Sequence, residues 1–123
     1  MNKKAARDGA ERLGEFEQLA LLAVMRLGED AYGARVQEEL EAVAGRDASI
    51  SQIYITLTRL ESKGLVSSWM GPPEPVRGGK ARRYFRVEPA GAVALNEGRS
   101  RLLAMWDGLE RALEATAGGV VAD

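Results

Sequence analysis

The chain has 123 residues, of which 46% are hydrophobic and 28% are charged; this is the size and balance of one soluble globular domain. It contains no histidine and no cysteine, which excludes imidazole bases, thiol nucleophiles, disulfides and metal sites built from thiolate or imidazole ligands. The formal net charge of -1 gives by itself no indication of a nucleic-acid partner.

The sequence contains no segment that resembles a membrane span or a signal peptide. The longest uninterrupted apolar run extends from Leu19 to Met25 and is far shorter than the roughly 20 residues that a membrane-spanning helix needs. The N-terminal residues do not lead into the apolar stretch of a signal peptide. We therefore expect a cytoplasmic protein.

The N-terminal part of the chain divides at Glu15. Residues 1–14 are charged, small and interrupted by glycine, and we expect them to form a flexible arm. From Glu15 to Leu27 the apolar residues lie on nearly all sides of a predicted helix, with Leu21, Leu22 and Met25 opposite Phe16. Such a helix must be covered on two faces.

Two further helices are predicted before residue 64. The first extends from about Ala31 to Ala44, and residues 45–48 form a short polar turn. Ser49 stands at the N-cap of the next helix, where its hydroxyl can accept from free backbone N–H groups. The buried stripe of this third helix is predicted to comprise Ile50, Ile53, Leu57 and Leu60, and its C-cap to be Gly64.

A hairpin follows the third helix. The runs Leu65–Met70 and Ala81–Val87 contain β-favouring residues such as Trp69, Tyr84 and Phe85. The segment between them, residues 71–80, is too rich in proline and glycine to continue either strand. The sequence therefore predicts two strands joined by a long loop.

The last predicted element is a long helix that Pro89 opens and that extends to about Ala117. Apolar residues within it follow a heptad spacing that is interrupted by Arg99, and they comprise Leu95, Leu102, Trp106, Leu109 and Leu113. Since no other segment is long enough to pack along this seam, we expect it to meet the same helix of a second copy. Residues 118–123 are expected to fray.

Helix, short turn, helix and hairpin follow one another in the order of a winged helix-turn-helix, whose second helix enters the DNA major groove. We therefore predict a mainly α (α+β) fold with a two-stranded β wing and a long C-terminal dimerisation helix. The expected organisation is a flexible arm at 1–14, a DNA-binding domain at 15–88, the dimerisation helix at 89–117 and a frayed tail at 118–123.

The near-neutral total charge hides an uneven distribution. The net charge is -3 for residues 1–48, +5 for residues 49–87 and -3 for residues 88–123. Between Val76 and Val87 there are five cations and no acid. A run of charged residues can simply be a solvated surface. The position of this run directly after a helix-turn-helix pattern instead favours a DNA-binding wing.

The third helix has an outward face without any acid. At about 100° per residue, the face opposite the apolar stripe comprises Ser51, Gln52, Ile55, Thr58, Arg59 and Ser62, with Tyr54 and Thr56 at its borders. Such polar side chains donate to phosphates or read base edges. Ile55 has two interpretations, a contact with a thymine methyl group or a simple exposed apolar residue.

These residues resemble the PadR family of bacterial winged-helix transcriptional regulators, over about Gly14 to Leu109. The resemblance is carried by Tyr32-Gly33, by Ile53-Tyr54, by the run from Leu57 to Val66, by Arg82-Arg83-Tyr84-Phe85 and by the C-terminal helix with Trp106. It implies a dimeric DNA-binding repressor whose C-terminal helices form much of the dimer contact. It also implies a contribution of the first helix, for which we select Leu21 and Met25.

Two positions depart from the family pattern. Ala34 follows Gly33 where the family usually has an aromatic residue, and Ile55 follows Tyr54 where proline is frequent. The operator sequence is therefore not transferable. In some relatives an aromatic residue of the C-terminal helix lines a pore for planar ligands, and Trp106 matches that place. The alternative is that Trp106 packs against its mate in the seam, so a small aromatic effector stays an open expectation.

The leading hypothesis is a homodimeric repressor that acts at a neighbouring promoter and is associated with the nucleoid when bound. The expected groove contacts are Ser49, Ser51, Gln52, Tyr54, Ile55, Thr56 and Arg59. The expected phosphate contacts are Lys63, Arg77, Lys80, Arg82 and Arg83. No cofactor or metal is expected. The alternative is a winged-helix protein-interaction module, which predicts an acidic or apolar outward face. An enzyme is disfavoured because Gly79-Lys80-Ala81 lacks the rest of a phosphate-binding loop.

Overall fold

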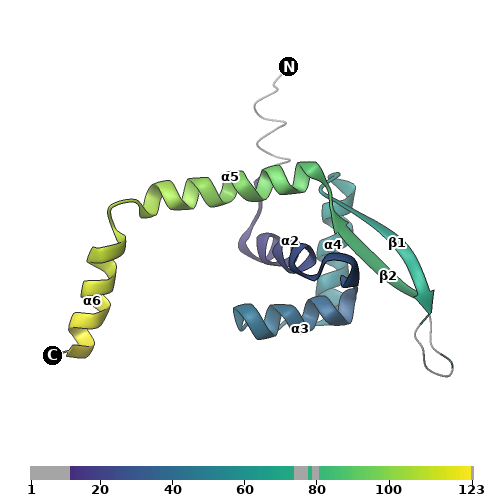
Figure 1. The fold of residues 1–123 in the computed structure, drawn as a ribbon, viewed down its shortest axis with the longest axis horizontal. Coiled ribbons are helices and arrows are strands. Elements are labelled where there is room, and N and C mark those ends of the chain that lie inside the picture. The colour runs from purple at the N-terminus through teal and green to yellow at the C-terminus, as the bar shows by residue number, and fades with distance from the viewer. Residues whose placement is uncertain (1–11, 74–77, 79–80, 123) are drawn as a thin grey trace, which may run out of the picture.

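The computed structural model describes residues 12–73, 78 and 81–122. The expected order of elements is confirmed: helices come first, a two-stranded hairpin follows, and helical structure ends the chain (Figure 1). The elements are α2 (Glu15–Leu27), the 3-10 turn η1 (Gly28–Asp30), α3 (Gly33–Ala44), α4 (Ile50–Ser62), β1 (Val66–Pro73), β2 (Ala81–Val87), α5 (Pro89–Trp106) and α6 (Glu110–Ala122).

One hydrophobic core lies between α2, α3, α4 and the hairpin. The largest residue in it is Phe85 of β2, which is fully buried together with Leu21 of α2 and Leu57 of α4. The backbone N–H of Phe85 donates to the carbonyl of Ala31 at 2.9 Å, and Tyr32 forms an isolated antiparallel bridge with Tyr84. The segment before α3 thus fastens the hairpin to the helices.

The start of α4 is as expected. Ser49 is the N-cap, and its hydroxyl accepts from the backbone N–H of Gln52 at 3.0 Å. Ile53, Leu57 and Leu60 are fully buried, whereas the prediction for Ile50 was wrong, because this residue is 36% exposed. It lies in the first turn of the helix, ahead of the point where α4 meets the core.

The hairpin is longer than expected on its first side. β1 pairs with β2 antiparallel, from Val66 opposite Val87 to Met70 opposite Arg83, and then, after an irregularity, Pro73 lies opposite Ala81. Gly71 to Pro73 are therefore strand residues, not loop. Proline is compatible with this position because the sheet has only two strands. The outer edge of β1 pairs with no further strand, so a residue without a backbone N–H breaks no hydrogen bond there.

The predicted C-terminal helix is broken. α5 ends at Trp106 and α6 begins at Glu110, and Gly108 between them has a φ of 81°, the left-handed conformation that commonly ends a helix at glycine. Figure 1 shows α6 turning sharply away from the axis of α5. The heptad seam is therefore not continuous on one straight helix, and α6 extends to Ala122 where a frayed end was expected.

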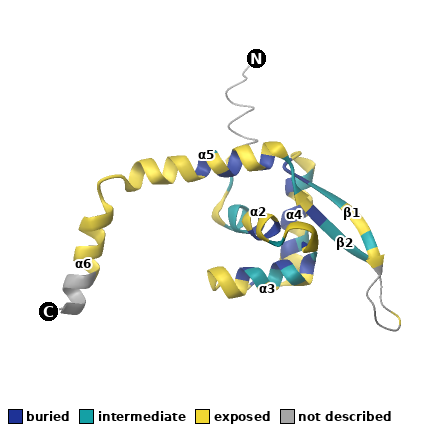
Figure 2. Cartoon of the chain, in the orientation of Figure 1, coloured by how far each residue is buried: buried dark blue, intermediate teal, exposed yellow. Residues whose placement is uncertain are grey.

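The two halves of α5 have different surroundings. Ala94 and Leu95 in the first half are buried, and Gly91 lies against the carbonyl oxygen of Leu65. The second half and the described part of α6 are exposed (Figure 2). The first half of α5 thus belongs to the core of the domain, and the second half projects from it.

The boundary expected at residue 14 is also shifted. Leu13 packs against the core, and the backbone N–H of Gly14 donates to Glu17 Oε1 at 3.0 Å, which caps the start of α2. The rest of the predicted arm, residues 1–11, lies outside the described residues. The domain therefore begins before Glu15.

Candidate nucleic-acid interface

The outward face of α4 is exposed as predicted. Solvent reaches all six of its residues, which are Ser51, Gln52, Ile55, Thr58, Arg59 and Ser62. Ile55 is the most informative, since its exposed fraction of 63% means that folding does not require an isoleucine there. The face offers hydroxyl, amide and guanidinium groups around one apolar side chain, the groups that contact phosphates, base edges and thymine methyl groups.

Two expected groove residues have other roles. Thr56 is only 3% exposed, so its assignment to the groove was wrong; it follows Ile53 by three positions and therefore shares the buried side of the helix. Ser49 is exposed, but its hydroxyl already accepts from Gln52 as the N-cap. Its hydroxyl hydrogen remains available to donate to a phosphate.

Tyr54 is half-buried at the edge of the face. Its ring centroid lies 5.9 Å from that of Phe85, and Gly33 at the start of α3 is close to its hydroxyl end. The ring therefore packs between α3 and the hairpin. The ring thus helps to set the position of α4.

The cations at the C-terminal end of α4 face an acid. Arg59 Nε lies 3.3 Å and Lys63 Nζ lies 3.9 Å from Oε2 of Glu17 in α2. The Arg59 side chain is 51% exposed and that of Lys63 is 32% exposed, so both can still reach solvent. Sequence reasoning missed Glu17, which lies 42 residues from Arg59 and reaches it only through tertiary packing.

Arg83 is engaged within the domain. Its guanidinium donates to Glu61 Oε1 at 2.6 Å, to Ser68 Oγ at 3.1 Å and to Thr58 Oγ1 at 3.4 Å. In β2 it lies on the same face as Phe85, two residues away, and that face is turned towards α4. Arg83 therefore joins the hairpin to α4, a role that the sequence did not predict for it.

The other face of the hairpin carries stacked rings and cations. Trp69 and Tyr84 are stacked with centroids 5.8 Å apart, and Tyr32 meets Tyr84 edge-on at 5.5 Å. Arg82 lies 4.2 Å above Tyr32 and Arg86 lies 5.0 Å above Trp69. The alternation of Arg82, Tyr84 and Arg86 along the strand is the sequence signal that could have revealed this platform. Arg77 and Lys80, the other expected wing cations, lie outside the described residues.

The residues expected at a dimer interface fall into two groups. Leu21 is fully buried and Leu95 is 7% exposed, so neither can contact a partner; both belong to the core of their own chain. Met25, Leu102, Trp106, Leu109 and Leu113 are between 45% and 55% exposed. Leu22, which follows Leu21, is 42% exposed, so the open side of α2 carries Leu22 and Met25 and not Leu21.

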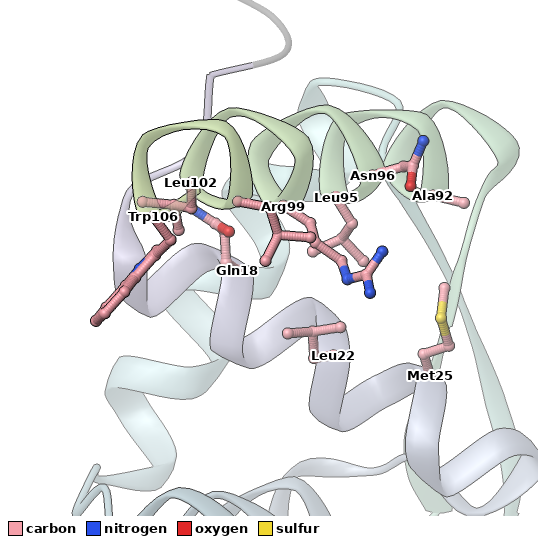
Figure 3. Close-up of a pocket in the computed structure, with 10 residues that line it drawn as sticks. Gln18, Leu22, Met25, Ala92, Leu95, Asn96, Arg99, Leu102 and Trp106 are labelled. Carbon is pink, nitrogen blue, oxygen red and sulfur yellow. The ribbon is translucent and has the colours of Figure 1, made fainter. Parts of the chain in front are cut away.

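A cavity of about 560 Å³ lies between α2 and α5. Figure 3 shows Leu95, Leu102 and Trp106 on its α5 side and Leu22 and Met25 on its α2 side, with Arg99 extending from α5 into the space between the helices. Its lining is predominantly apolar. In the described part of the chain, no group of three or more Asp or Glu residues is placed to hold a metal ion, and none of the helices is long and apolar enough to cross a membrane.

Comparison with known proteins agrees with this geometry. Residues 21–97 match the Transcriptional regulator PadR-like family. The chain is 37% identical over 91 residues to the transcriptional regulator Rv3488 of Mycobacterium tuberculosis, covering 72% of this chain and 80% of that protein. Among solved structures, a PadR family transcriptional regulator from Eggerthella lenta is 29% identical with a TM-score of 0.61, covering 81% of this chain and 87% of that one.

A further solved structure with the same fold is that of Bacillus subtilis PadR in complex with operator DNA. It is 20% identical with a TM-score of 0.55, covering 68% of this chain and 47% of that one. The match over most of the described residues identifies a class of regulators and not of enzymes. The chain belongs to the PadR-like family of transcriptional regulators.

Proposed function

We propose that this regulator is a sequence-specific repressor that binds double-stranded DNA as a homodimer, at a promoter next to its own gene. The observation that carries the proposal is the exposed, acid-free face of α4 beside a cation-bearing hairpin. A helix with this face fits the major groove, where Gln can pair with adenine and an apolar side chain can meet a thymine methyl group. Binding of this kind places the protein at the nucleoid.

The roles within the interface follow from exposure and partners. Ser51, Gln52 and Ile55 are open to solvent near the N-terminal half of α4 and are proposed to read bases. Arg59 and Lys63 are proposed to contact phosphates at its other end. The wing is proposed to contact phosphates through Arg82, Arg77 and Lys80. The operator complex formed by Bacillus subtilis PadR supports this assignment, since that protein shares the fold.

The proposed homodimer is supported by apolar surface that a single chain leaves uncovered. Leu102, Leu103, Met105 and Trp106 follow one another along the projecting half of α5 and are 55%, 48%, 75% and 45% exposed. Contiguous exposed apolar residues of this kind mark interaction surfaces in soluble proteins. In the proposed dimer, this half of α5 packs against α5 and α2 of a second copy.

A small planar aromatic effector is proposed for the same region. The α2–α5 cavity has room for a drug-sized molecule, and Trp106 lines it. Titration of planar phenolic acids and cationic dyes into a Trp69→Phe variant tests this, since Trp106 is then the only tryptophan. Quenching in Trp69→Phe that is absent from Trp106→Phe, which keeps Trp69 as its tryptophan, supports the effector; unchanged fluorescence with every compound leaves Trp106 as a packing residue.

DNA binding is tested by fluorescence anisotropy with the fragment upstream of the gene and a shuffled fragment of equal length. The wild type should prefer the upstream fragment, and Ser51→Ala with Gln52→Ala should remove most of the preference, at about 1–3 kcal/mol for each lost base contact. Thr116→Ala in α6 is the matched surface control. A wild-type protein that binds neither fragment would refute the proposal and favour a protein-interaction module.

A further inference from the structure

The start of α4 is joined to α3 through one side chain. The amide Nε2 of Gln37 in α3 donates to the backbone carbonyl oxygen of Ala48 at 2.7 Å, and Ala48 immediately precedes Ser49, the N-cap of α4. Gln37 is half-buried and Ala48 is buried, so this bond is partly shielded from water. The residue that it holds leads directly into the proposed recognition helix.

The turn between α3 and α4 is held differently in its two halves. In the first half, the backbone N–H groups of residues 45 and 46 donate to carbonyls near the end of α3 at 3.0 Å. In the second half, Asp47 and Ala48 make no backbone hydrogen bond to any other described residue. The Ala48 methyl group packs in the core, but apolar contact is non-directional, whereas a hydrogen bond has a preferred distance and angle. Gln37 thus supplies the directional contact of the second half.

The first turn of α4 depends on this connection because its own side chains do not enter the core. The first buried residue of the helix is Ile53, whereas Ile50 is 36% exposed and Ser51 and Gln52 are exposed. Ser51 and Gln52 are proposed to read bases, and hydrogen bonds to base edges require good distance and alignment. The groups that discriminate between base pairs therefore lie between the residue bonded to Gln37 and the first core residue of α4.

We propose that Gln37 is a positioning residue for sequence recognition: it fixes the first turn of α4 in the major groove through the Ala48 carbonyl and does not itself touch DNA. The inference rests on the proposed DNA-binding function. Arg59 and Lys63 lie further along α4, beyond the buried Ile53 and Leu57, so their phosphate contacts should not depend on Gln37. Loss of the bond should lower discrimination between sequences and leave the general attraction to DNA in place.

Gln37→Met removes the donor and keeps nearly the same side-chain length and volume. The test compares dissociation constants for the upstream fragment and for the shuffled fragment by fluorescence anisotropy. The preference for the upstream fragment should fall by about tenfold, the equivalent of one lost base contact. The affinity for the shuffled fragment and its salt dependence should stay as in the wild type, since both report phosphate contacts. An unchanged preference would overturn the proposal, and an equal loss of affinity for both fragments would make Gln37 a phosphate contact instead.

Gln18→Met is the matched control. Nε2 of Gln18 donates to the carbonyl of Leu13 at 3.1 Å, so the same substitution removes the same kind of bond in α2, and the preference should not change. Gln37→Lys restores a donor at the end of an unbranched chain and should recover most of the preference, while its added charge strengthens binding to the two fragments alike. A preference that Gln18→Met lowers equally, or that Gln37→Lys does not restore, would overturn the proposal in favour of a general loss of stability.

Hydrogen exchange of the free protein tests the position of α4 without DNA. The N–H of Gln52 donates to Ser49 Oγ at 3.0 Å and the N–H of Ile53 donates to the Ser49 carbonyl at 3.1 Å. Gln37→Met should speed the exchange of these two amides by about tenfold, because the first turn opens locally more often, while amides near Leu60 keep their rates. Unchanged rates would refute the anchoring role.

The two measurements separate the inference from the function on which it rests. Faster exchange with an unchanged preference for the upstream fragment would show that Gln37 anchors α4 but does not govern recognition, which overturns the inference alone. A wild type that prefers neither fragment would refute the proposed function, and with it any role of Gln37 in recognition.

Discussion

Gly33, the first residue of α3, lies directly against the ring of Tyr54 in α4: a Cβ atom built on Gly33 would come within 2.9 Å of the Cε2, Cζ and hydroxyl oxygen atoms of that ring. The ring is also 5.9 Å, centroid to centroid, from Phe85 of β2. Tyr54 is thus held between the start of one helix and the hairpin. The pairing explains why a glycine begins α3, since any side chain would push α4 away from it.

Gly33→Ala should lower the free energy of unfolding by about 1–2 kcal/mol, the cost of forcing extra atoms into a packed site. Thermal unfolding of the purified variant measures this. In a Tyr54→Leu background, which removes the ring, Gly33→Ala should cost much less. Equal costs in the two backgrounds would show that the ring does not set the position of α3.

Two glycines of α5 should respond to alanine in opposite directions. At Gly91 the new Cβ would collide with the carbonyl oxygen of Leu65, which cannot move freely because it accepts from the N–H of Glu88 at 2.9 Å. At Gly98 the Cβ would lie 3.2 Å from Oε1 of Gln18. The amide of Gln18 donates to the carbonyl of Leu13 at 3.1 Å, but the side chain needs to shift by only a few tenths of an ångström, which this bond can follow.

Gly91→Ala should therefore destabilise the domain by about 1–3 kcal/mol. Gly98→Ala should stabilise it by up to about 1 kcal/mol, because alanine is the better helix former. Each is compared with the wild type by urea unfolding. Stabilisation by both changes would mean that α5 does not dock against the turn at Leu65 as described.

Arg83→Gln should loosen the hairpin from α4, because it removes the ion pair to Glu61 and a donor to Thr58. Both side chains of the pair are 33% exposed, so solvent screens the loss and about 1 kcal/mol of stability is expected to disappear. Arg86→Gln, on the opposite face of β2, is the matched control. A double variant with Glu61→Gln should lose little beyond Arg83→Gln, since the two residues act as a pair.

Glu17→Gln should strengthen binding to DNA of any sequence. The change removes the acid beside Arg59 and Lys63 while an amide oxygen can still cap Gly14. Each released cation that reaches a phosphate should steepen the dependence of log affinity on log salt by about 0.9. Glu15→Gln removes the same charge two residues earlier, where the side chain is 86% exposed, and should have a smaller effect. Identical salt slopes for the two variants would contradict the role of Glu17.

The sequence by itself determined the order of elements, the exposed face of α4 and the concentration of positive charge in residues 49–87. These features depend on local periods and on composition. Ser51, Gln52 and Ile55 share a face because a helix repeats every 3.6 residues, and Ser49 caps because its hydroxyl lies beside free N–H groups. The resemblance to the family rested on the same short motifs, and the match over residues 21–97 bears it out.

Only the tertiary structure decided which partner each side chain meets. Periodicity grouped Leu21 with Leu22 and Met25, but packing buries Leu21 and leaves Leu22 and Met25 exposed, because the neighbouring helices determine which side of α2 faces the core. Arg83 and Glu61 lie 22 residues apart, a separation at which no local pattern pairs them. The heptad spacing crosses Gly108 without interruption in the sequence, but the left-handed backbone of that glycine turns α6 out of line. Local rules describe single elements, and contacts between elements depend on how they pack together.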